Sequence, residues 1–245
     1  MTQLLIYESV VPVSAERHRN ACVEIGDNYR FTSKVNALPL MAVEFPPAAQ
    51  EYAIVFAGQG DGIMPTILLG FRPAENLYIS AEDHWDAGYK PAFVRRYPFV
   101  FSPAPDGTRL ILCIDEAFTG LNHDDRGEKL FDAEGKPTAF VDGVLKFSQE
   151  FHAQFLRAQA FCKRLKDLNL LEEVQAQVEL PSHQKIALRG FSAVNRAKLK
   201  GLPVEQLVNL VKTDELELIY LHLQSLRNLS LLSQRLSNQR DKGAA

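Results

Sequence analysis

Residues 84–101, HWDAGYKPAFVRRYPFVF, combine many large apolar side chains with fixed positive charge, more so than any other part of the chain. They include the only tryptophan, Trp85, and two adjacent arginines, Arg95 and Arg96. Large aromatic side chains dominate the energetics of the cores and interfaces that they join. A guanidinium stays charged in every surrounding, so it needs carboxylate, carbonyl or aromatic neighbours. We therefore expect this segment to organise the fold.

Two conformations are open for the second half of this segment. In the first, a helical turn begins at Pro91 and ends at Arg96, because the first turn of a helix tolerates a missing N–H. The residue before Pro98 is then extended, and a strand follows at residues 99–101. In the second, residues 93–101 form one strand with aromatic side chains and an arginine on one face. We favour the first, since the second needs Pro98 at a sheet edge.

Composition and charge limit the possible classes of protein. The chain has 245 residues, of which 46% are hydrophobic and 23% are charged, as in ordinary globular domains. The formal net charge of −3 argues against nucleic acid as the main partner. Cys22, Cys113 and Cys162 are odd in number and widely spaced, which predicts reduced, buried thiols.

The first residues, MTQLLIYESVVPV, have no basic region and no small-residue cleavage site, so we expect no signal peptide. No apolar run approaches the about 20 residues that a membrane-spanning helix needs. We therefore expect a soluble, cytoplasmic protein without membrane insertion.

Short runs of β-branched and aromatic residues predict a largely antiparallel sheet in the first part of the chain. The strongest pair is 51–57 and 64–71, joined by a glycine-rich turn at Gly58–Gly62. That turn resembles a phosphate-binding loop, but Pro65 and a β-branched run follow it where such loops require a helix. We interpret it as a hairpin loop. Further strands are expected at residues 4–13, 77–79 and 109–114.

The second part of the chain has a helical pattern. Between residues 144 and 171, apolar residues recur at three- and four-residue steps, which predicts a helix with one buried stripe. A strand is expected at 177–180 and a helix from Pro203 to Val211. Thr213 or Asp214 is expected to cap a final helix that runs to residue 235, followed by a frayed tail.

The final helix carries more apolar surface than a single buried stripe requires. We assign its regular seam, Leu216, Ile219, Leu223 and Leu226, to the core of the protein. The opposite face, with Tyr220 and Arg227, is then the candidate interface for a protein partner or a second copy, because tyrosine and arginine are enriched at interfaces.

These elements predict an α+β fold. Residues 1–143 form an antiparallel β-rich region with the aromatic and arginine-containing segment, and residues 144–245 form a helical region. The sequence leaves open whether the two regions are one continuous domain.

With these elements placed, the whole chain resembles the SapC family of bacterial proteins. The matching segments occur in family order: EYAIVFA (51–57), ILLGFRPAENLYI (67–79), WDAGYKPAFVRRYPFVF (85–101), LFDAEGKPT (130–138), FSAVNRAKLKGLP (191–203) and LELIYLHLQSLRNL (216–229). The family takes its name from a protein associated with a bacterial surface layer. Many members look like companions of outer-membrane TonB-dependent receptors, tryptophan-halogenase-like flavoproteins and cupin-type proteins. The resemblance brings no set of catalytic residues.

Four residues are candidates for ligand binding: Trp85, Tyr89, Arg95 and Arg96. A tryptophan face suits a sugar ring or a cation, and an arginine suits a carboxylate or phosphate. The alternative, which we favour, places the aromatic rings in the core and pairs the arginines with carboxylates. The carboxylates considered are Glu44, Asp115 and Glu116.

Metal binding and nucleophilic catalysis have weaker support. His123, Asp124 and Asp125 offer metal-ligating atoms, but their spacing matches neither HExxH nor an EF-hand loop. We interpret them as a solvated acidic loop. The scattered histidines and cysteines form no recognisable triad. We therefore name no catalytic residue, no metal and no cofactor.

The preferred function is a non-enzymatic accessory or regulatory protein that binds a protein partner or a small ligand, with a link to outer-membrane nutrient uptake systems implied by the resemblance. The first alternative is an enzyme that acts on a peptide or sugar at a pocket around Trp85 and Arg95. The second is a surface-layer component or export factor.

Overall fold

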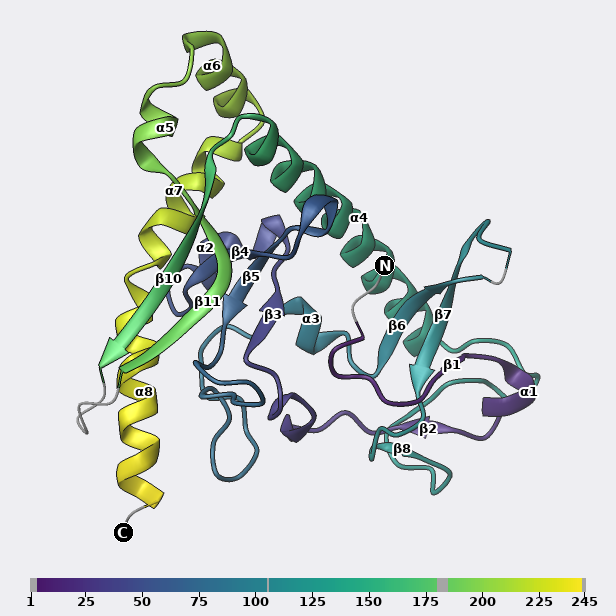
Figure 1. Cartoon of the computed structure of the whole chain (residues 1–245). Helices are drawn as coiled ribbons and strands as arrows, with labels where there is room; N and C mark the ends of the chain where they lie inside the picture. Colours follow the sequence, from purple (N-terminus) through teal and green to yellow (C-terminus); the bar gives the residue numbers. More distant parts are fainter. Residues whose placement is uncertain (1–3, 105, 180–184, 244–245) are drawn as a thin grey trace.

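The computed structural model describes residues 4–104, 106–179 and 185–243. Antiparallel sheets occupy mainly the N-terminal part and helices follow toward the C-terminus, which confirms the α+β prediction. In Figure 1 the chain has a triangular outline, with the long helix α4 (Ala139–Asp167) along one side. Helices α7 (Glu215–Ser225) and α8 (Asn228–Gly243) lie along another side.

A five-stranded antiparallel sheet forms the centre of one half of the molecule. Its strand order is β10-β11-β4-β5-β3. The strands are β3 (Ala37–Pro39), β4 (Ile54–Ala57), β5 (Met64–Leu68), β10 (Leu171–Glu179) and β11 (Lys185–Val194). The predicted β4–β5 hairpin is confirmed, and its turn holds the 3-10 helix η3 (Gly60–Gly62). Because β11 pairs with β4, this sheet joins strands from both predicted regions.

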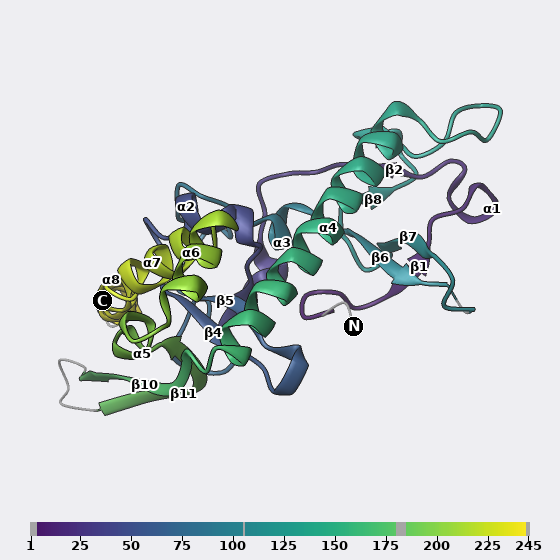
Figure 2. The same ribbon diagram turned by 90° about the horizontal axis from the view of Figure 1, so that it is seen from above.

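Two smaller sheets form the other half, as Figure 2 shows from above. One has the order β1-β7-β6 and the other β8-β2-β9. Their strands are β1 (Val10–Pro12), β2 (Cys22–Val23), β6 (Phe99–Pro103), β7 (Leu110–Asp115), β8 (Leu121–Asn122) and β9 (Glu128–Lys129). Helix α4 runs along both halves and packs against β5 and β6.

Short helices connect these sheets. They are α1 (Ala15–His18), η1 (Arg30–Thr32), η2 (Ala42–Glu44), α2 (Phe45–Ala48) and α3 (Ala92–Arg95). The helix α3 confirms the favoured conformation of residues 84–101: Pro91 precedes the helical turn, and strand β6 begins after Pro98. The peptide bond between Tyr97 and Pro98 is cis.

The C-terminal helices begin with α5 (Arg196–Lys200) and α6 (Val204–Lys212), and Pro203 precedes α6 as predicted. The prediction of one final helix over 214–235 was wrong, because the helix is interrupted between α7 and α8. Two buried polar side chains fix this break. Ser225 accepts a hydrogen bond from the Ile54 amide, and the Asn228 amide donates to the carbonyl groups of Ala49 and Tyr52.

The predicted seam of Leu216, Ile219, Leu223 and Leu226 packs against the core, as expected, but the most deeply buried residues of α7 extend to one side of it. Leu218, Ile219 and His222 are buried, whereas Leu216 and Leu223 are only half-buried. Helix α8 continues to Gly243, beyond the expected end at residue 235. The apolar pattern could not show this, because leucine occurs on nearly every side of α7.

Three strand predictions need correction. Of the strand expected at residues 4–13, only β1 (Val10–Pro12) forms. Residues 77–79 form only one bridge, between Ile79 and Trp85, because the Asn76 side chain accepts the Tyr78 amide hydrogen and holds a local turn. The strand expected at 177–180 begins earlier, at Leu171, and its partner β11 was missed. The last residue of that prediction, Leu180, lies outside the described residues.

The main core lies between the five-stranded sheet and helices α2, α4 and α7. Its largest buried side chains include Phe45, Tyr52, Phe56, Tyr78 and Phe161. The three cysteines are buried thiols, as predicted. Among the described residues, the helices are all too short or too polar to cross a membrane.

Candidate functional site

A cleft lies between the loop that precedes α3, the segment around η1 and the loop after β7. Its volume is about 740 Å³. We call it the aromatic cleft because five rings line it: Tyr29, Phe31, Trp85, Tyr97 and Phe118. Three cations, Lys90, Arg95 and Arg126, line the same cleft.

The five rings form a continuous row. Trp85 meets Tyr29 edge to face at 6.3 Å between ring centroids, and Tyr29 lies 6.0 Å from Phe31. Phe31 stacks on Tyr97 at 4.0 Å, and Tyr97 meets Phe118 edge to face at 5.4 Å. Such pairs add about 0.5–1.5 kcal/mol beyond the area that they bury. These ring contacts therefore hold the five side chains together as one wall of the aromatic cleft.

Hydrogen bonds to Tyr52 and Tyr89 hold the Trp85 ring in place. Its exposed fraction is 9%, which confirms the prediction that the ring belongs to the core. The indole nitrogen donates to the Tyr52 hydroxyl at 3.0 Å and to the Tyr89 carbonyl oxygen at 3.2 Å. The Tyr52 hydroxyl in turn donates to the same carbonyl oxygen. Burial raises the pKa of Tyr52 well above its usual value, so the phenol stays a hydrogen-bond donor.

Two carboxylates hold the loop that carries Trp85. Glu51 accepts hydrogen bonds from the amides of Gly88 and Tyr89 at 2.7 and 2.8 Å. Gly88 allows this approach, because a Cβ there would lie 2.9 Å from the Glu51 carboxylate. Glu44, which is buried, accepts from the Tyr89 hydroxyl and from the Ala92 amide, each at 2.7 Å. The loop and the first turn of α3 are thereby fixed to η2.

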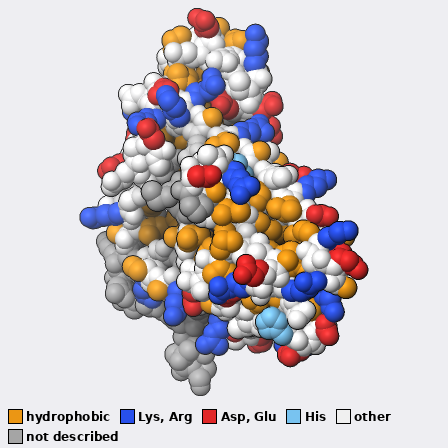
Figure 3. All heavy atoms as spheres, turned by 90° about the vertical axis from the view of Figure 1, so that its right-hand side faces the viewer, with side chains coloured by type: hydrophobic (Ala, Val, Ile, Leu, Met, Phe, Trp, Pro, Cys, Tyr) orange, Lys and Arg blue, Asp and Glu red, His pale blue; other side chains and the backbone are white. Residues whose placement is uncertain are grey.

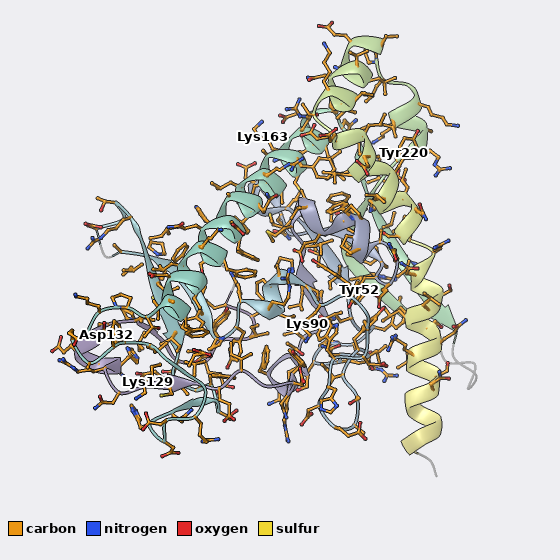
Figure 4. The ribbon with its side chains drawn as sticks, turned by 180° about the vertical axis from the view of Figure 1, so that it is seen from behind. Tyr52, Lys90, Lys129, Asp132, Lys163 and Tyr220 are labelled. Atoms are coloured by element: carbon orange, nitrogen blue, oxygen red, sulfur yellow. The ribbon has the colours of Figure 1, made fainter. Side chains whose placement is uncertain are left out.

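Lys90 and Arg95 place positive charge at the cleft. Lys90 lies near the middle of the molecule in Figure 4, with Nζ 3.9 Å from the Tyr29 ring centroid and hydrogen-bonded to the Tyr29 hydroxyl. Arg95 is exposed and donates from Nε to the Lys90 carbonyl oxygen at 3.1 Å. Within the described ranges, neither cation lies within ion-pair distance of a carboxylate. Arg126 differs, because Glu24 binds it at 2.7 Å.

The four predicted ligand residues separate into three surroundings. Trp85 and Arg95 line the aromatic cleft together. Tyr89 lies behind the cleft wall, and burial followed by the nearby Glu44 charge raises the pKa of its hydroxyl. Arg96 is buried and lines a cavity on the other side of α3, and a third cavity is lined by both Arg95 and Arg96.

The carboxylate partners that we considered for the arginines are engaged elsewhere. Glu44 binds the loop as described above, and Asp115 accepts from the amides of Glu8 and Ser9, each at 2.8 Å. Glu116 forms an ion pair with Arg17. Arg96 instead lies against the rings of Phe93 and Phe151 and is hydrogen-bonded to the Tyr7 hydroxyl. The prediction that one of these three carboxylates pairs with the buried arginine was therefore wrong.

The remaining candidates are not part of the lining of the aromatic cleft. The acidic loop is paired with cations: Asp124 faces Arg126 at 3.8 Å and Asp125 binds Lys129 at 2.8 Å. Among the residues that the structure describes, no group of three potential metal ligands converges. The exposed fraction of Tyr220 is 47%, and it lies on α7 at the edge of the molecule in Figure 4. Arg227 is also exposed; an interface through these two residues stays a prediction.

Sequence reasoning missed most of the cleft. Lys90 lies inside the segment that opened the sequence analysis, but its position beside Tyr29 depends on a contact across 61 residues of chain. Phe31 and Phe118 lie in segments without a clear periodic pattern. The available signal was slight, because Tyr29 just before η1 and Phe118 just after β7 lie in polar segments.

Comparison with known proteins identifies one relationship. A family model described as SapC matches residues 13–232. No curated protein and no solved structure gives a significant match to the chain.

Proposed function

The chain belongs to the SapC family, and from this premise we propose a non-enzymatic accessory protein that binds a small anionic ligand with a planar ring in the aromatic cleft. The observation that carries the proposal is the row of five rings beside Lys90 and Arg95. Rings offer flat apolar faces to a planar group, and the two cations attract a carboxylate or phosphate.

The two cations give the cleft its preference for anions. Both Lys90 and Arg95 are held by hydrogen bonds to neutral oxygens, which leave their charge uncompensated locally. A hydrogen bond to a charged group contributes about 1.5–3 kcal/mol, compared with about 1 kcal/mol for a neutral pair. An anion that reaches both side chains therefore gains more binding free energy than a neutral ligand of the same shape.

Binding without chemistry fits the lining better than catalysis does. The carboxylate of the lining, Glu24, is already neutralised by Arg126 at 2.7 Å. A general base needs a proton-accepting group near the reacting atom. The rings and cations of the cleft instead supply contact area and charge, which are the means of recognition.

The proposal is tested with three probes of matched shape or charge. They are 1-naphthaleneacetate, the cation 1-naphthylmethylamine, and acetate, which lacks the ring. Binding is measured by calorimetry and by the fluorescence of Trp85, the only tryptophan. We expect naphthaleneacetate to bind at least about tenfold more tightly than either of the others, because it alone uses both rings and charge.

Two variants and a control complete the test. Lys90→Met and Arg95→Gln each weaken naphthaleneacetate binding by about tenfold, which corresponds to one lost charge-assisted hydrogen bond. The control Lys163→Met removes a lysine on α4 that pairs with Asp167 and leaves the affinity unchanged. Equal affinity for the anionic and cationic probes, or equal effects of Lys90→Met and Lys163→Met, would rule out the proposed site.

A further inference from the structure

A second cavity lies on the opposite side of α3, between α4, β6 and β7. Its volume is about 200 Å³. We call it the apolar cavity, because Phe101, Leu110, Phe151, Phe155 and Leu156 form much of its wall. Figure 3, which views the molecule from the side of these strands, shows hydrophobic side chains gathered near the middle of this face.

The apolar cavity has a guanidinium in its wall. Arg96 is 6% exposed, and its guanidinium carbon lies 4.1 Å from the Phe93 ring centroid and 4.5 Å from that of Phe151. Its side chain is hydrogen-bonded to the Tyr7 hydroxyl, which itself donates to the Phe99 carbonyl oxygen at 2.7 Å. Burial lowers the pKa of Arg96, but a guanidinium keeps its proton in proteins. A full positive charge therefore lies in surroundings of low dielectric, where an anion is attracted more strongly than in water.

A second polar group faces the same space. Ser148 of α4 is 6% exposed and lines the apolar cavity together with Arg96. Its hydroxyl is buried and has no hydrogen-bond partner among the described residues. Buried hydroxyl groups nearly always have a partner, and a helical serine can bond the carbonyl one turn earlier. The free hydroxyl beside a buried cation is an independent sign of a site for a polar ligand group.

We propose that the apolar cavity binds a monocarboxylate with a flexible apolar chain, such as a medium-chain fatty acid. The carboxylate lies at Arg96 and Ser148, and the chain lies against Phe101, Phe155 and Leu156. A carboxylate accepts hydrogen bonds from both polar groups while its single charge balances the guanidinium. A phosphate group fits less well, because its second negative charge would lose its hydration in a wall made largely of apolar side chains, where His152 is the other titratable residue of the lining.

This site is separate from the aromatic cleft. Arg95, the last residue of α3, lines the cleft, and Arg96, the residue after it, lines the apolar cavity. The two linings share no residue, although both arginines also line a third cavity. The two sites also differ in shape: one is an open row of rings, and the other is a narrow space under α4. The proposal of a carboxylate site in the apolar cavity therefore does not depend on the function proposed for the aromatic cleft.

The test compares decanoate, decanol and decylamine by calorimetry on the full chain. Decanoate should bind at least about tenfold more tightly than decanol, since it alone uses the charge of Arg96. Decylamine should bind more weakly than decanol, because its ammonium group is repelled. A saturating concentration of naphthaleneacetate should leave decanoate binding unchanged. Equal affinity for decanoate and decanol, or competition between decanoate and naphthaleneacetate, would overturn the inference.

Variants locate the site without removing the buried arginine, whose loss endangers folding. Ser148→Ala should weaken decanoate binding by about fivefold and decanol binding by much less, because it removes one hydrogen bond to the carboxylate. Leu156→Glu places a negative charge at the rim, where the side chain is 52% exposed, and should weaken decanoate binding by about tenfold. The control Ser230→Ala, at an exposed position in α8, should have no effect. Unchanged decanoate affinity in both Ser148→Ala and Leu156→Glu contradicts the proposed site.

Discussion

His222 connects helix α7 to the central sheet and makes the stability of the fold depend on pH. Its Nε2 accepts the Val194 amide hydrogen at 3.0 Å, and its Nδ1 donates to the Ile54 carbonyl oxygen at 2.8 Å. The side chain is fully buried and lies 4.8 Å from the Phe56 ring. Since one nitrogen accepts and the other donates, the imidazole must be neutral in the folded protein.

Burial lowers the pKa of His222 from 6.5 to about 4. The unfolded chain therefore binds a proton at this residue more readily than the folded chain does, and stability falls as the pH falls from 6.5 toward 4. The difference between the two values corresponds to about 3 kcal/mol of unfolding free energy. This contribution is complete above pH 6.5 and is lost once the pH is below about 4.

His222→Gln isolates this contribution. A glutamine amide can donate to the Ile54 carbonyl and accept from the Val194 amide, but it does not titrate. Buried Glu215, whose pKa is raised by burial, is present in both proteins and cancels in the comparison. We expect the variant to be less stable than the wild type above pH 6.5, by about 1–2 kcal/mol, because it loses packing against Phe56. At low pH the order should reverse.

The assay is urea unfolding at a series of pH values between neutral and acidic, followed by Trp85 fluorescence. His84→Gln, at an exposed position, reports the effect of replacing an imidazole by an amide at the surface. If the stability difference between wild type and His222→Gln stays constant across the series, the reasoning about the buried neutral imidazole is refuted.

Two further predictions concern the core and the surface. Trp85→Ala should cost about 3–5 kcal/mol in thermal or urea unfolding followed by circular dichroism, because it removes a buried ring and leaves a cavity, whereas a loss below about 1 kcal/mol would contradict its burial. Tyr220→Ala combined with Arg227→Glu should leave the melting temperature nearly unchanged while weakening any self-association seen by light scattering. A wild type that stays monomeric, with partners captured equally by the double variant, would remove the predicted interface.

Local chemistry made several parts of the fold predictable. The helical turn after Pro91, the hairpin at Gly58–Gly62 and the start of α6 after Pro203 all follow from proline and glycine restrictions on the backbone. These signals act within a few residues, so they survive in any tertiary surrounding. The burial of Trp85 was equally accessible, because an apolar ring of that size has few alternatives.

The break between α7 and α8 shows where sequence reasoning stops. The leucine pattern runs through the break without interruption, and neither proline nor glycine marks it. Ser225 and Asn228 end α7 only because their side chains reach the backbone of residues more than 170 positions earlier. A tertiary contact thus overrides a local helix preference, and the pattern of one segment cannot report it.

The arginine pair illustrates the same limit at the candidate sites. Sequence reasoning placed Arg95 and Arg96 either together in one ligand site or in pairs with carboxylates. Successive residues of a helical turn point about 100 degrees apart. Arg95 therefore lines the aromatic cleft and Arg96 the apolar cavity, although both also line a third cavity. Arg95 keeps its exposure beside a row of rings, and Arg96 enters an apolar wall beside a free serine hydroxyl. Because an anion is attracted to each for a different reason, the two positions select different ligands: a planar anion at the first and a flexible acyl carboxylate at the second.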